Sequence, residues 1–553
     1  MNRHRMERRR RLRGLLALTV LLGGVVVALA VQPVLGERGA TRLRVLWTND
    51  THGYLKPLYH REPWDADYER LARQEGKLGG FAHIATLVKR LRGEMPDRTL
   101  LLDSGDTWHG TAVPLFEGGK TVVRVMNAMK YDAMTPGNVE FLYPREVLLA
   151  RIKEARFPVI AANWVDDVED PVVPPYVVKT VGGLRVGIIG MTYQWSRKTG
   201  DPKLTEGWSF GFREHTVREY IRELREDKKV DLVLMISHMG FGADVKFASR
   251  VSGIDAILGA HTHDYIDPVM KVNGTLVCQA GSHGKNLGRL DLWVKDGKIV
   301  RYDHQIYRIR VKEIPPDPAI QKIIDEGYAP YRAKLERVIG QTKTMLFRRA
   351  TWQSTMDNFI TDAYRDMEGA DVAFGPAWRF GATILPGDIR VEDVYNMVPA
   401  AGHLLTYTLT GQAIKDLLES ALDNVLNEDP YLVLGGDMTR FSGLEVRFDP
   451  RRPLGQRFVS IKVNGKPLDP KRRYRIVSAN TQFHRMRGVE QLRDTGKVAV
   501  EELIKYIERK KVIAPKLDDR IKAVPGREKD LKEIEDRRVF GPGTGDRTKL
   551  LRR

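Results

Sequence analysis

The sequence contains a single cysteine, Cys278, among 553 residues. One cysteine cannot form an internal disulfide, so a disulfide-stapled scaffold is excluded, and we expect Cys278 to be a small buried side chain. The chain also lacks internal repeats and low-complexity blocks. With 42% hydrophobic and 29% charged residues, it has the composition of a globular protein rather than a disordered one. Its length predicts roughly two to four domains of about 150 residues each.

Residues 1–36 have the pattern of a secretory signal peptide. An arginine-rich start precedes an uncharged stretch at 15–31, and the small residues Ala28 and Ala30 match a cleavage site. The apolar run is slightly short of the ~20 residues that span a bilayer, although an uncleaved N-terminal anchor is the alternative. We therefore expect a periplasmic or otherwise exported protein, and the consecutive arginines suggest the twin-arginine route.

The formal charge of the chain is +19, but seven arginines lie within its first thirteen residues. The positive balance that remains suits an anionic substrate or partner, and equally well a solvated surface rich in Lys and Arg. We expect no nucleic acid as a partner. Contact with a membrane is expected only through an uncleaved N-terminal anchor.

Apolar runs and amphipathic segments alternate after the signal, which is typical of an α/β layered domain. Buried strands are expected at 42–48, 99–102, 159–162, 185–191, 232–237 and 256–259. The proline-rich run at 314–318 interrupts this pattern. We therefore expect a first domain at 41–312, a linker helix at 313–339, a second domain at 340–525 and a charged tail at 526–553.

Polar residues follow the expected strands of the first domain at five places. Asp-x-His and His-x-His pairs can converge on one ion where the backbone curls at a strand exit, and open α/β sheets bind ligands at the carboxyl ends of their strands. Carboxylate, imidazole and amide donors suit Mn, Fe or Zn, with Mn at the hard-ligand end of that range. The five groups are Asp50-Thr51-His52, Asp103-Ser104-Gly105-Asp106, Gly137-Asn138, Ser237-His238 and His261-Thr262-His263.

The order Asn-Asp-x-His, Gly-Asp, Gly-Asn, His and Gly-x-His-x-His resembles that of the calcineurin-like dinuclear metallophosphoesterases. The segment from Gly80 onward looks like their secreted 5′-nucleotidase branch, and residues 375–379 with 385–389 are similar to the C-terminal domain of that branch. The resemblance implies an α/β fold: a four-layer β-sandwich flanked by helices, plus a smaller α+β C-terminal substrate-binding domain.

The same resemblance implies a dinuclear hydrolase with two divalent ions, Mn²⁺ in first place and Zn²⁺ or Fe as alternatives. Two such ions can activate water and clamp the oxygens of a tetrahedral oxyanion. The family pattern assigns one ion to Asp50, His52, Asp106 and His263, and the other to Asp106, Asn138, His238 and His261. Asp106 is the expected bridge between them.

The turn at 136–141 departs from the phosphatase pattern. That pattern has a proton-donating His and an orienting Asp where this chain has Val139 and Leu142. A general acid is worth about 10² to 10⁴ in rate when an alkoxide leaves. A thiolate leaves far more easily, so the turn favours sulfur as the leaving atom.

Further segments look like the SoxB thiosulfohydrolases, a family within this branch: 58–63, 79–91, 106–110, 429–431 and 435–438. This resemblance implies a hydrolase that releases sulfate, by metal-hydroxide attack, from a cysteine-S-thiosulfonate during thiosulfate oxidation. The implied partner is a SoxYZ-like carrier protein with a cysteine-bearing arm. The chain differs from that family at Asn138, where His is usual, and at His109, where Gln is usual.

The resemblance also suggests residues around the substrate. Arg379 faces the cleft in the family pattern and is expected to bind a sulfonate oxygen, with Arg61 and Asp437 as further substrate contacts. His109 follows Asp106 by three residues and is a candidate proton donor. Two other functions stay open: a periplasmic 5′-nucleotidase or related phosphoesterase, and a non-catalytic metal-containing binding protein, against which the complete ligand set argues.

Overall fold

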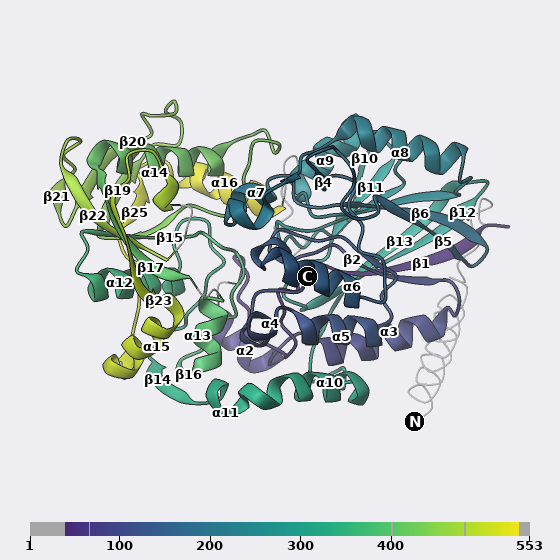
Figure 1. The fold of residues 1–553 in the computed structure, drawn as a ribbon, viewed down its shortest axis with the longest axis horizontal. Helices are drawn as coiled ribbons and strands as arrows, with labels where there is room; N and C mark the ends of the chain where they lie inside the picture. Colours follow the sequence, from purple (N-terminus) through teal and green to yellow (C-terminus); the bar gives the residue numbers. More distant parts are fainter. Residues whose placement is uncertain (1–38, 66, 400–401, 480–482, 541–553) are drawn as a thin grey trace, which may run out of the picture.

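The computed structural model describes residues 39–540 except 66, 400–401 and 480–482. The expected signal or anchor at 1–36 and the end of the expected tail at 541–553 therefore lie outside the described residues. Two lobes follow one another along the chain in Figure 1, the first coloured purple to teal and the second green to yellow. Within the described part of the chain, no helix is both long and apolar enough to cross a membrane.

Two sheets form the centre of the N-terminal domain. Their strand orders are β13-β12-β1-β2-β3 and β10-β11-β9-β8-β6-β5. Strands β1, β2 and β3 run parallel to one another, as do β6, β8, β9 and β11, so that within each set the carboxyl ends lie at one edge. The first sheet consists of β1 (Thr41–Thr48), β2 (Thr99–Asp103), β3 (Ala133–Met134), β12 (Asn286–Lys295) and β13 (Lys298–Arg308). The second consists of β5 (Tyr176–Val181), β6 (Leu184–Met191), β8 (Leu232–Ser237), β9 (Ala256–Gly259), β10 (Met270–Val272) and β11 (Thr275–Gln279).

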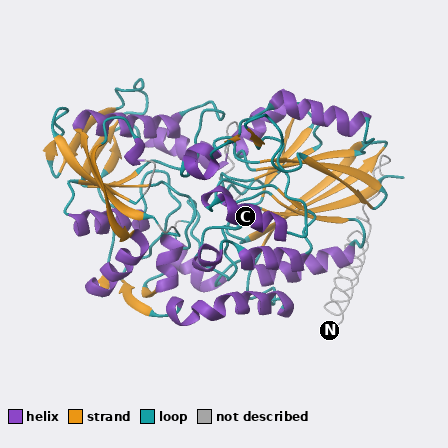
Figure 2. Ribbon diagram, viewed as in Figure 1, coloured by secondary structure: helices purple, strands orange, loops and turns teal. Residues whose placement is uncertain are grey.

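The alternation of side chains along these strands fills three apolar layers. Val45 and Trp47 of β1 pack between the sheets, whereas Leu46 packs under the helices, because successive side chains point to opposite faces of a strand. Helices cover both outer faces, as Figure 2 shows: α3 (Phe81–Glu94) and α5 (Lys120–Met129) on the first sheet, α8 (Glu214–Glu226) and α9 (Phe241–Arg250) on the second. The four-layer sandwich that the family resemblance implies is confirmed.

Five of the six expected strands form within one residue of their expected bounds, but the strand expected at 159–162 is wrong. This segment is buried and joins a sheet only through one bridge to Met134. Ile160 donates its N–H to Met134 in the first sheet (2.8 Å), while Ala162 donates to Gly190 in the second (2.7 Å). Because its hydrogen bonds are divided between two sheets, the apolar run forms no regular ladder.

Two helices, α10 (Pro318–Tyr328) and α11 (Arg332–Leu335), connect the lobes along the lower edge in Figure 1. Asp317 begins α10, because its carboxylate accepts two backbone N–H groups of the first turn at 3.0 and 3.1 Å. Pro318 follows at the first helical position, where its missing N–H leaves no bond unmade. The proline-rich run that interrupts the α/β pattern is therefore the start of a helix.

The C-terminal domain is built on a five-stranded sheet of order β18-β15-β22-β17-β23. Its members are β15 (Val372–Gly375), β17 (His403–Thr410), β18 (Arg440–Ser442), β22 (Arg473–Ser478) and β23 (Glu490–Val498). Helices α12 (Thr355–Glu368) and α15 (Ala499–Lys510) cover one face, and α14 (Gly411–Leu426) covers the other. The predicted α+β architecture is confirmed.

Smaller elements surround that sheet. A four-stranded sheet contains β19 (Leu444–Phe448), β20 (Phe458–Val463), β21 (Lys466–Pro467) and β25 (Ile521–Ala523), and a three-stranded one contains β14 (Val338–Thr342), β16 (Gly387–Arg390) and β24 (Val512–Ile513). The charged segment expected as a tail begins with helix α16 (Glu528–Phe540). Its Leu531 and Ile534 pack against the same apolar cluster as α14, so this part of the segment belongs to the domain.

A buried ion pair ties β1 to β12. Arg44 and Asp291 face each other in register, and the guanidinium donates to both carboxylate oxygens at 2.8 and 3.1 Å. Asp291 is fully buried. We expect Asp291→Asn to lower the free energy of unfolding by about 3 to 5 kcal/mol, because the buried guanidinium of Arg44 then keeps only the half-exposed Glu94 as a counter-charge. Urea denaturation of the two proteins measures this difference.

The matched control is Asp303→Asn. Asp303 lies opposite Asp291 on β13, but its side chain is 49% exposed and pairs with Arg289 at the surface. Its loss should change the free energy of unfolding by about 0 to 1 kcal/mol. Equal effects of the two substitutions would contradict the assignment of Asp291 as a buried structural charge.

Candidate metal centre

The expected metal ligands converge at the carboxyl ends of β1, β2, β3, β8 and β9. Because parallel strands end at the same edge of a sheet, residues from distant parts of the chain meet there. Six of them form two groups in which every ligand atom lies within 4.8 Å of the others in its group: Asp50, His52 and His263 in the first group, and Asp106, His238 and His261 in the second. This is the division that the family pattern implies.

Asp106 lies between the two groups. Its Oδ2 is 3.2 Å from His238 Nε2 in the second group and 3.8 Å from His52 Nε2 in the first. Asp50 Oδ1 is 3.3 Å from His263 Nε2 and 3.8 Å from His238 Nε2. The Asp106 carboxylate is therefore in position to bridge two ions, one held by each group.

Asn138 completes the second group. Its Oδ1 is 2.9 Å from His261 Nδ1, so the amide oxygen and this ring nitrogen share one side of the group. All seven expected ligands thus meet at one edge of the sandwich. Their roles as ligands stay a prediction. The orientation of the histidine ring nitrogens supports it further.

The orientation of the ring nitrogens fits cations better than hydrogen bonds. His238 Nδ1 is 2.7 Å from the Ser104 carbonyl, which fixes the proton there and leaves the buried Nε2 without a hydrogen-bond partner among the described residues. His52 and His263 direct their Nε2 atoms at each other, 3.0 Å apart. A cation between such lone pairs stabilises both rings, so the residues fit two divalent ions with mixed nitrogen and oxygen ligands.

Burial and the carboxylates set the protonation of the site in opposite ways. Burial lowers the pKa of His52 to about 3 and that of His261 well below its ordinary value, so both rings are neutral and able to ligate. Burial also opposes protonation of His238, but Asp106 and Asp50 outweigh it and raise its pKa to about 10. Positive charge is therefore favoured beside the two carboxylates, where the ions would bind.

The backbone at the strand exits is strained. Five of the seven ligands have φ between 47° and 69°, a left-handed conformation that costs a non-glycine residue about 1 to 3 kcal/mol; they are Asp50, His52, Asp106, His261 and His263. Gly137 makes the close approach of the loops possible, because a Cβ there would lie 2.1 Å from Asp106 Oδ1 and 2.6 Å from His238 Cε1. Only glycine fits at this position.

Glu140 holds two of the ligand loops together. Its buried carboxylate accepts the backbone N–H groups of Thr107 and Trp108 at 2.7 and 2.8 Å, and those of Gly137 and Asp106 at 2.7 and 3.1 Å. Sequence reasoning overlooks this residue, although it lies two positions after Asn138 in the same turn. The only available signal is a carboxylate in an otherwise apolar stretch.

Val139 separates Asn138 from Glu140 and donates its backbone N–H to Asp106 Oδ1 at 2.8 Å. Its side chain is buried. Leu142 ends the short 3-10 helix η1 (Glu140–Leu142) and is partly buried. The turn beside the second metal group therefore carries no side chain that can donate a proton at either position.

The C-terminal domain covers the centre and contributes a small cavity beside it. Arg379 and Asp437 line this cavity together with Thr262, the residue between His261 and His263. Arg379 donates to the Gly436 carbonyl at 3.0 Å and lies 3.7 Å from Asp437 Oδ1. The structure thus brings two of the expected substrate contacts to the metal centre.

Arg61 does not line this cavity. Its guanidinium lies over the Phe347 ring, 4.4 Å from the centroid, and its backbone N–H donates to Thr383. Arg349 lines the cavity instead, held by Glu62 Oε2 at 2.6 Å and Asp264 Oδ1 at 3.1 Å. Sequence reasoning overlooks Arg349 because nothing local distinguishes it from its neighbour Arg348.

His109, the candidate proton donor, lies three residues after Asp106 of the second metal group. His109 is buried edge-on against Tyr143, and burial lowers its pKa to about 4, so at neutral pH it lacks the extra proton of a general acid. Its proposed donor role stays a prediction that burial opposes.

Phe380, overlooked in the sequence, stacks on the ring of His52 with centroids 4.3 Å apart and packs on Trp378 at 5.3 Å.

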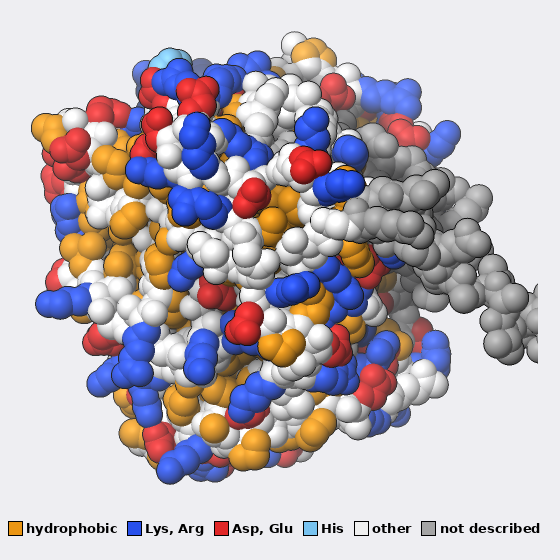
Figure 3. Space-filling view, turned by 90° about the vertical axis from the view of Figure 1, so that its right-hand side faces the viewer, with side chains coloured by type: hydrophobic (Ala, Val, Ile, Leu, Met, Phe, Trp, Pro, Cys, Tyr) orange, Lys and Arg blue, Asp and Glu red, His pale blue; other side chains and the backbone are white. Residues whose placement is uncertain are grey.

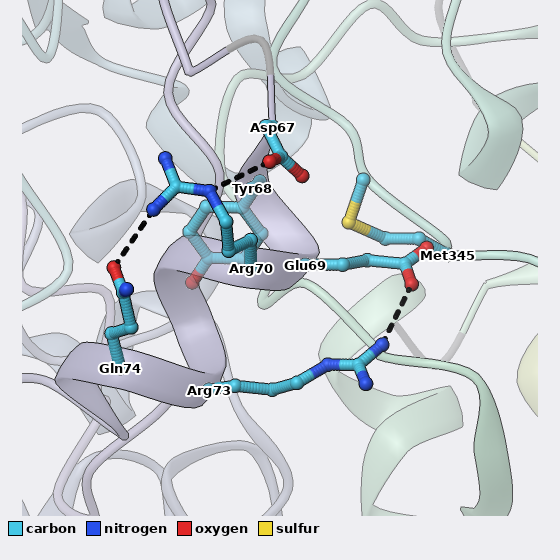
Figure 4. Close-up of a pocket in the computed structure, with 7 residues that line it drawn as sticks. All are labelled: Asp67, Tyr68, Glu69, Arg70, Arg73, Gln74 and Met345. Atoms are coloured by element: carbon cyan, nitrogen blue, oxygen red, sulfur yellow. Dashed lines mark hydrogen bonds and ion pairs between the residues drawn. The ribbon is translucent and has the colours of Figure 1, made fainter.

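The hollow on the outer surface in Figure 4 does not form a comparable site. The hollow in Figure 4 lies along α2 (Tyr68–Glu75), where Arg70 pairs with Asp67 at 2.8 Å and Arg73 with Glu69 at 3.5 Å, so its charges satisfy one another. On the face in Figure 3, Lys and Arg side chains are interspersed with Asp and Glu. The buried centre is therefore the candidate functional site.

A buried pair of metal sites at the strand ends of a four-layer sandwich defines a metal-dependent hydrolase. Comparison with known proteins agrees with this class: residues 43–265 match the calcineurin-like phosphoesterase family, and residues 338–494 match the 5′-nucleotidase C-terminal domain. The chain belongs to the calcineurin-like phosphoesterases that carry a 5′-nucleotidase C-terminal domain. Members of this family use a dinuclear divalent metal centre.

Relatives within this class differ in the bond they hydrolyse. The chain is similar to the SoxB sulfate thiohydrolase of Thermus thermophilus, with a TM-score of 0.83 and 27% identity over 87% of this chain and 97% of that one. It is also similar to a 5′-nucleotidase precursor from Thermus thermophilus, with a TM-score of 0.78 and 28% identity over 88% and 100%. The trifunctional nucleotide phosphoesterase YfkN of Bacillus subtilis is 27% identical over 564 residues, which cover 89% of this chain and 36% of that relative.

We expect Asp106→Ala to abolish metal binding at both sites, because the substitution removes the carboxylate that faces both groups. Elemental analysis of purified, metal-loaded protein measures the number of ions per chain. His215→Ala is the control, since that imidazole is 86% exposed on α8 and its loss should leave the metal content unchanged. Two ions per chain in Asp106→Ala would contradict the bridging assignment.

Proposed function

We propose that this protein is a SoxB-like hydrolase that releases sulfate from a cysteine-S-thiosulfonate on a sulfur-carrier protein during thiosulfate oxidation. One observation carries the proposal: the turn that provides Asn138 has Val139 and Leu142 where a phosphatase acid and its partner would stand. Val139 is buried and its backbone is bound to Asp106, so this turn cannot present a proton donor without a change of sequence.

The chemistry of the leaving group explains why that position matters. An alkoxide is a strong base and leaves slowly unless an acid protonates it, whereas a persulfide anion is a weak base and leaves unassisted. In the proposed reaction an oxygen of water bonds to the terminal sulfonate sulfur. The bond between that sulfur and the adjacent sulfur of the carrier adduct breaks, and the bond from the adjacent sulfur to the cysteine stays intact. The products are sulfate and the carrier persulfide, and the protons released by water pass to solvent.

Different side chains of this protein would hold the metal ions, bind the sulfonate and exclude bulk water. The seven ligands would hold two divalent ions, for which we propose Mn²⁺, with Zn²⁺ or Fe as alternatives, and such a pair activates water and neutralises charge on a tetrahedral oxyanion. Arg379 would bind a sulfonate oxygen, because its guanidinium lies in the cavity beside Thr262. The buried walls around Val139 would exclude bulk water from the sulfur.

The proposed function also calls for a carrier protein and for a cellular location. A thiosulfonate carried on the flexible arm of a second protein, such as a SoxYZ-like carrier, would reach the buried centre from outside. We further propose export to the periplasm, because residues 1–36 have the pattern of a signal peptide.

A 5′-nucleotidase is the alternative, favoured by the similarity to the Thermus thermophilus 5′-nucleotidase precursor and to YfkN. A nucleotidase benefits from aromatic rings that grip the base from both sides. Near the centre, Phe380 stacks on His52 and also packs on Trp378, so its faces are already occupied. This arrangement weighs against Phe380 as part of a base clamp.

We expect the manganese-loaded protein to release sulfate from thiosulfonated carrier and to release phosphate from AMP far more slowly, because only the alkoxide needs the missing acid. Ion chromatography for sulfate and a phosphate assay measure the two reactions at equal enzyme concentration. Brisk AMP hydrolysis without sulfate release would overturn the proposal in favour of the nucleotidase.

We expect the double variant Val139→His with Leu142→Asp to gain phosphatase activity, because it restores an acid and its orienting carboxylate on the turn. The rate of AMP hydrolysis should rise by up to about 10² to 10⁴-fold over that of the wild type. The single variant Leu142→Asp is the control and should show no gain, since it adds no proton donor. A double variant that binds its metals yet gains no activity would refute the role assigned to this turn.

A further inference from the structure

Tyr193 lies against the second metal group, on a loop that has no role in the proposed function. It follows β6 at the same edge of the sandwich as the metal ligands, and its ring stacks on that of His261 with centroids 4.0 Å apart and an angle of 22° between the planes. Tyr193 has no exposed surface, whereas His261 is partly exposed. The ring therefore supports the ring of an expected metal ligand.

The loop that carries Tyr193 is fixed on both sides. The side chain of Asn163 exchanges two hydrogen bonds of 2.8 Å with the backbone of Thr192. Ser196 donates its hydroxyl and its backbone N–H to the Tyr193 carbonyl at 2.7 and 3.1 Å. A residue held in this way keeps its direction without help from its own side-chain hydroxyl.

That hydroxyl is buried and has no hydrogen-bond partner among the described residues. A buried polar group left unpaired costs about 1 to 3 kcal/mol, and phenylalanine would provide the same stacking without this cost. Packing therefore explains the ring of Tyr193 but not its oxygen. An unpaired donor next to a metal centre is explained if a ligand completes its hydrogen bond.

The charges around the hydroxyl indicate what that ligand is. Arg379 and Asp106 both interact electrostatically with the Tyr193 hydroxyl. A phenol is protonated at neutral pH, so the hydroxyl carries a hydrogen that it can donate to an anion. Arg379 and Asp106, which both influence it, belong to the cavity and to the metal bridge respectively.

We propose that Tyr193 is a catalytic residue that donates a hydrogen bond from its hydroxyl to an oxygen of the tetrahedral anionic group of the substrate, beside Arg379. This inference rests on the proposed function for the identity of that group, a sulfonate. The neutral phenol and the cationic guanidinium then supply two different donors to one anion. No proton is transferred, so the step needs no further reactant.

Two other buried tyrosine hydroxyls lack a partner among the described residues, but their surroundings differ. Tyr54 packs on His283, which is not an expected metal ligand, and Tyr364 lies in α12 of the C-terminal domain. Tyr193 alone of the three stacks on an expected second-group ligand. Tyr364 therefore provides a matched control for the removal of an unpaired hydroxyl.

The test is Tyr193→Phe, studied as the full, manganese-loaded protein. The substitution keeps the ring that stacks on His261 and removes only the oxygen, so metal content and thermal stability should equal or exceed those of the wild type. We expect kcat/KM for thiosulfonated carrier to fall by about 10² to 10³-fold, as for the loss of one oxyanion donor. The Tyr364→Phe control should leave kcat/KM unchanged.

Binding of the product provides a second measurement. Calorimetric titration of the loaded protein with sulfate should give an affinity about 10- to 100-fold weaker for Tyr193→Phe than for the wild type, because a hydrogen bond to a charged group is lost. Unchanged activity and unchanged sulfate affinity would overturn the inference. A loss of activity that follows a loss of metal would also overturn it, since Tyr193 would then act only through His261.

These results separate the inference from the function on which it rests. If the wild type hydrolyses AMP and not the thiosulfonate, the proposed function fails, and the same comparison is made with AMP and phosphate. A fall in kcat/KM for Tyr193→Phe on AMP would then support the donor role for a phosphoryl oxygen. An equal rate on AMP would overturn that role independently.

Discussion

The position of the Asp106 carboxylate is the constraint on which the rest of the structure depends. It lies in an enclosed site between two groups of histidines, where an unpaired charge would be very unfavourable. Glu140 fixes the loop of Asp106 to the turn of Asn138, and Gly137 allows that turn to approach within contact distance. The carboxylates of Asp106 and Glu140 are thereby buried close together. Cations bound in the site would stabilise this arrangement.

The sandwich provides the stability that this site requires. Five ligands have left-handed backbone, each unfavourable by about 1 to 3 kcal/mol. The strands that end at these ligands have their side chains buried in three apolar layers, so the loops are anchored to rigid elements. The left-handed backbone at the strand exits directs Asp50, His52 and His263 toward a common point. The packed strands thus hold the ligand loops in a backbone conformation that is locally unfavourable but brings the metal ligands together.

The C-terminal domain determines what can reach the metals. Arg379 and Arg349 line the cavity beside Thr262, Phe380 covers the ring of His52, and Gly435 lies so close to His261 that a Cβ there would be 2.4 Å from Nε2. These contacts leave little room around the centre. A small anion presented at the end of a flexible arm suits such a site better than a bulky group that must be gripped on both faces.

The sequence by itself determined the α/β class and the candidate ligands, because both depend on local order, whereas the four-layer sandwich and the division of the ligands between two ions followed from the family resemblance. Apolar runs mark strands, and Asp50, His52, His261 and His263 follow them directly. Only the tertiary structure decided which polar residues besides the ligands surround the centre. Arg349 and Tyr193 have no distinguishing local pattern, and the only local signal of Glu140 is a carboxylate in an apolar stretch. The importance of these residues lies in partners distant in sequence or, for Tyr193, in a hydrogen-bond partner that is lacking among the described residues. Likewise, the segment at 159–162 has the composition of a strand, but its hydrogen bonds go to two different sheets.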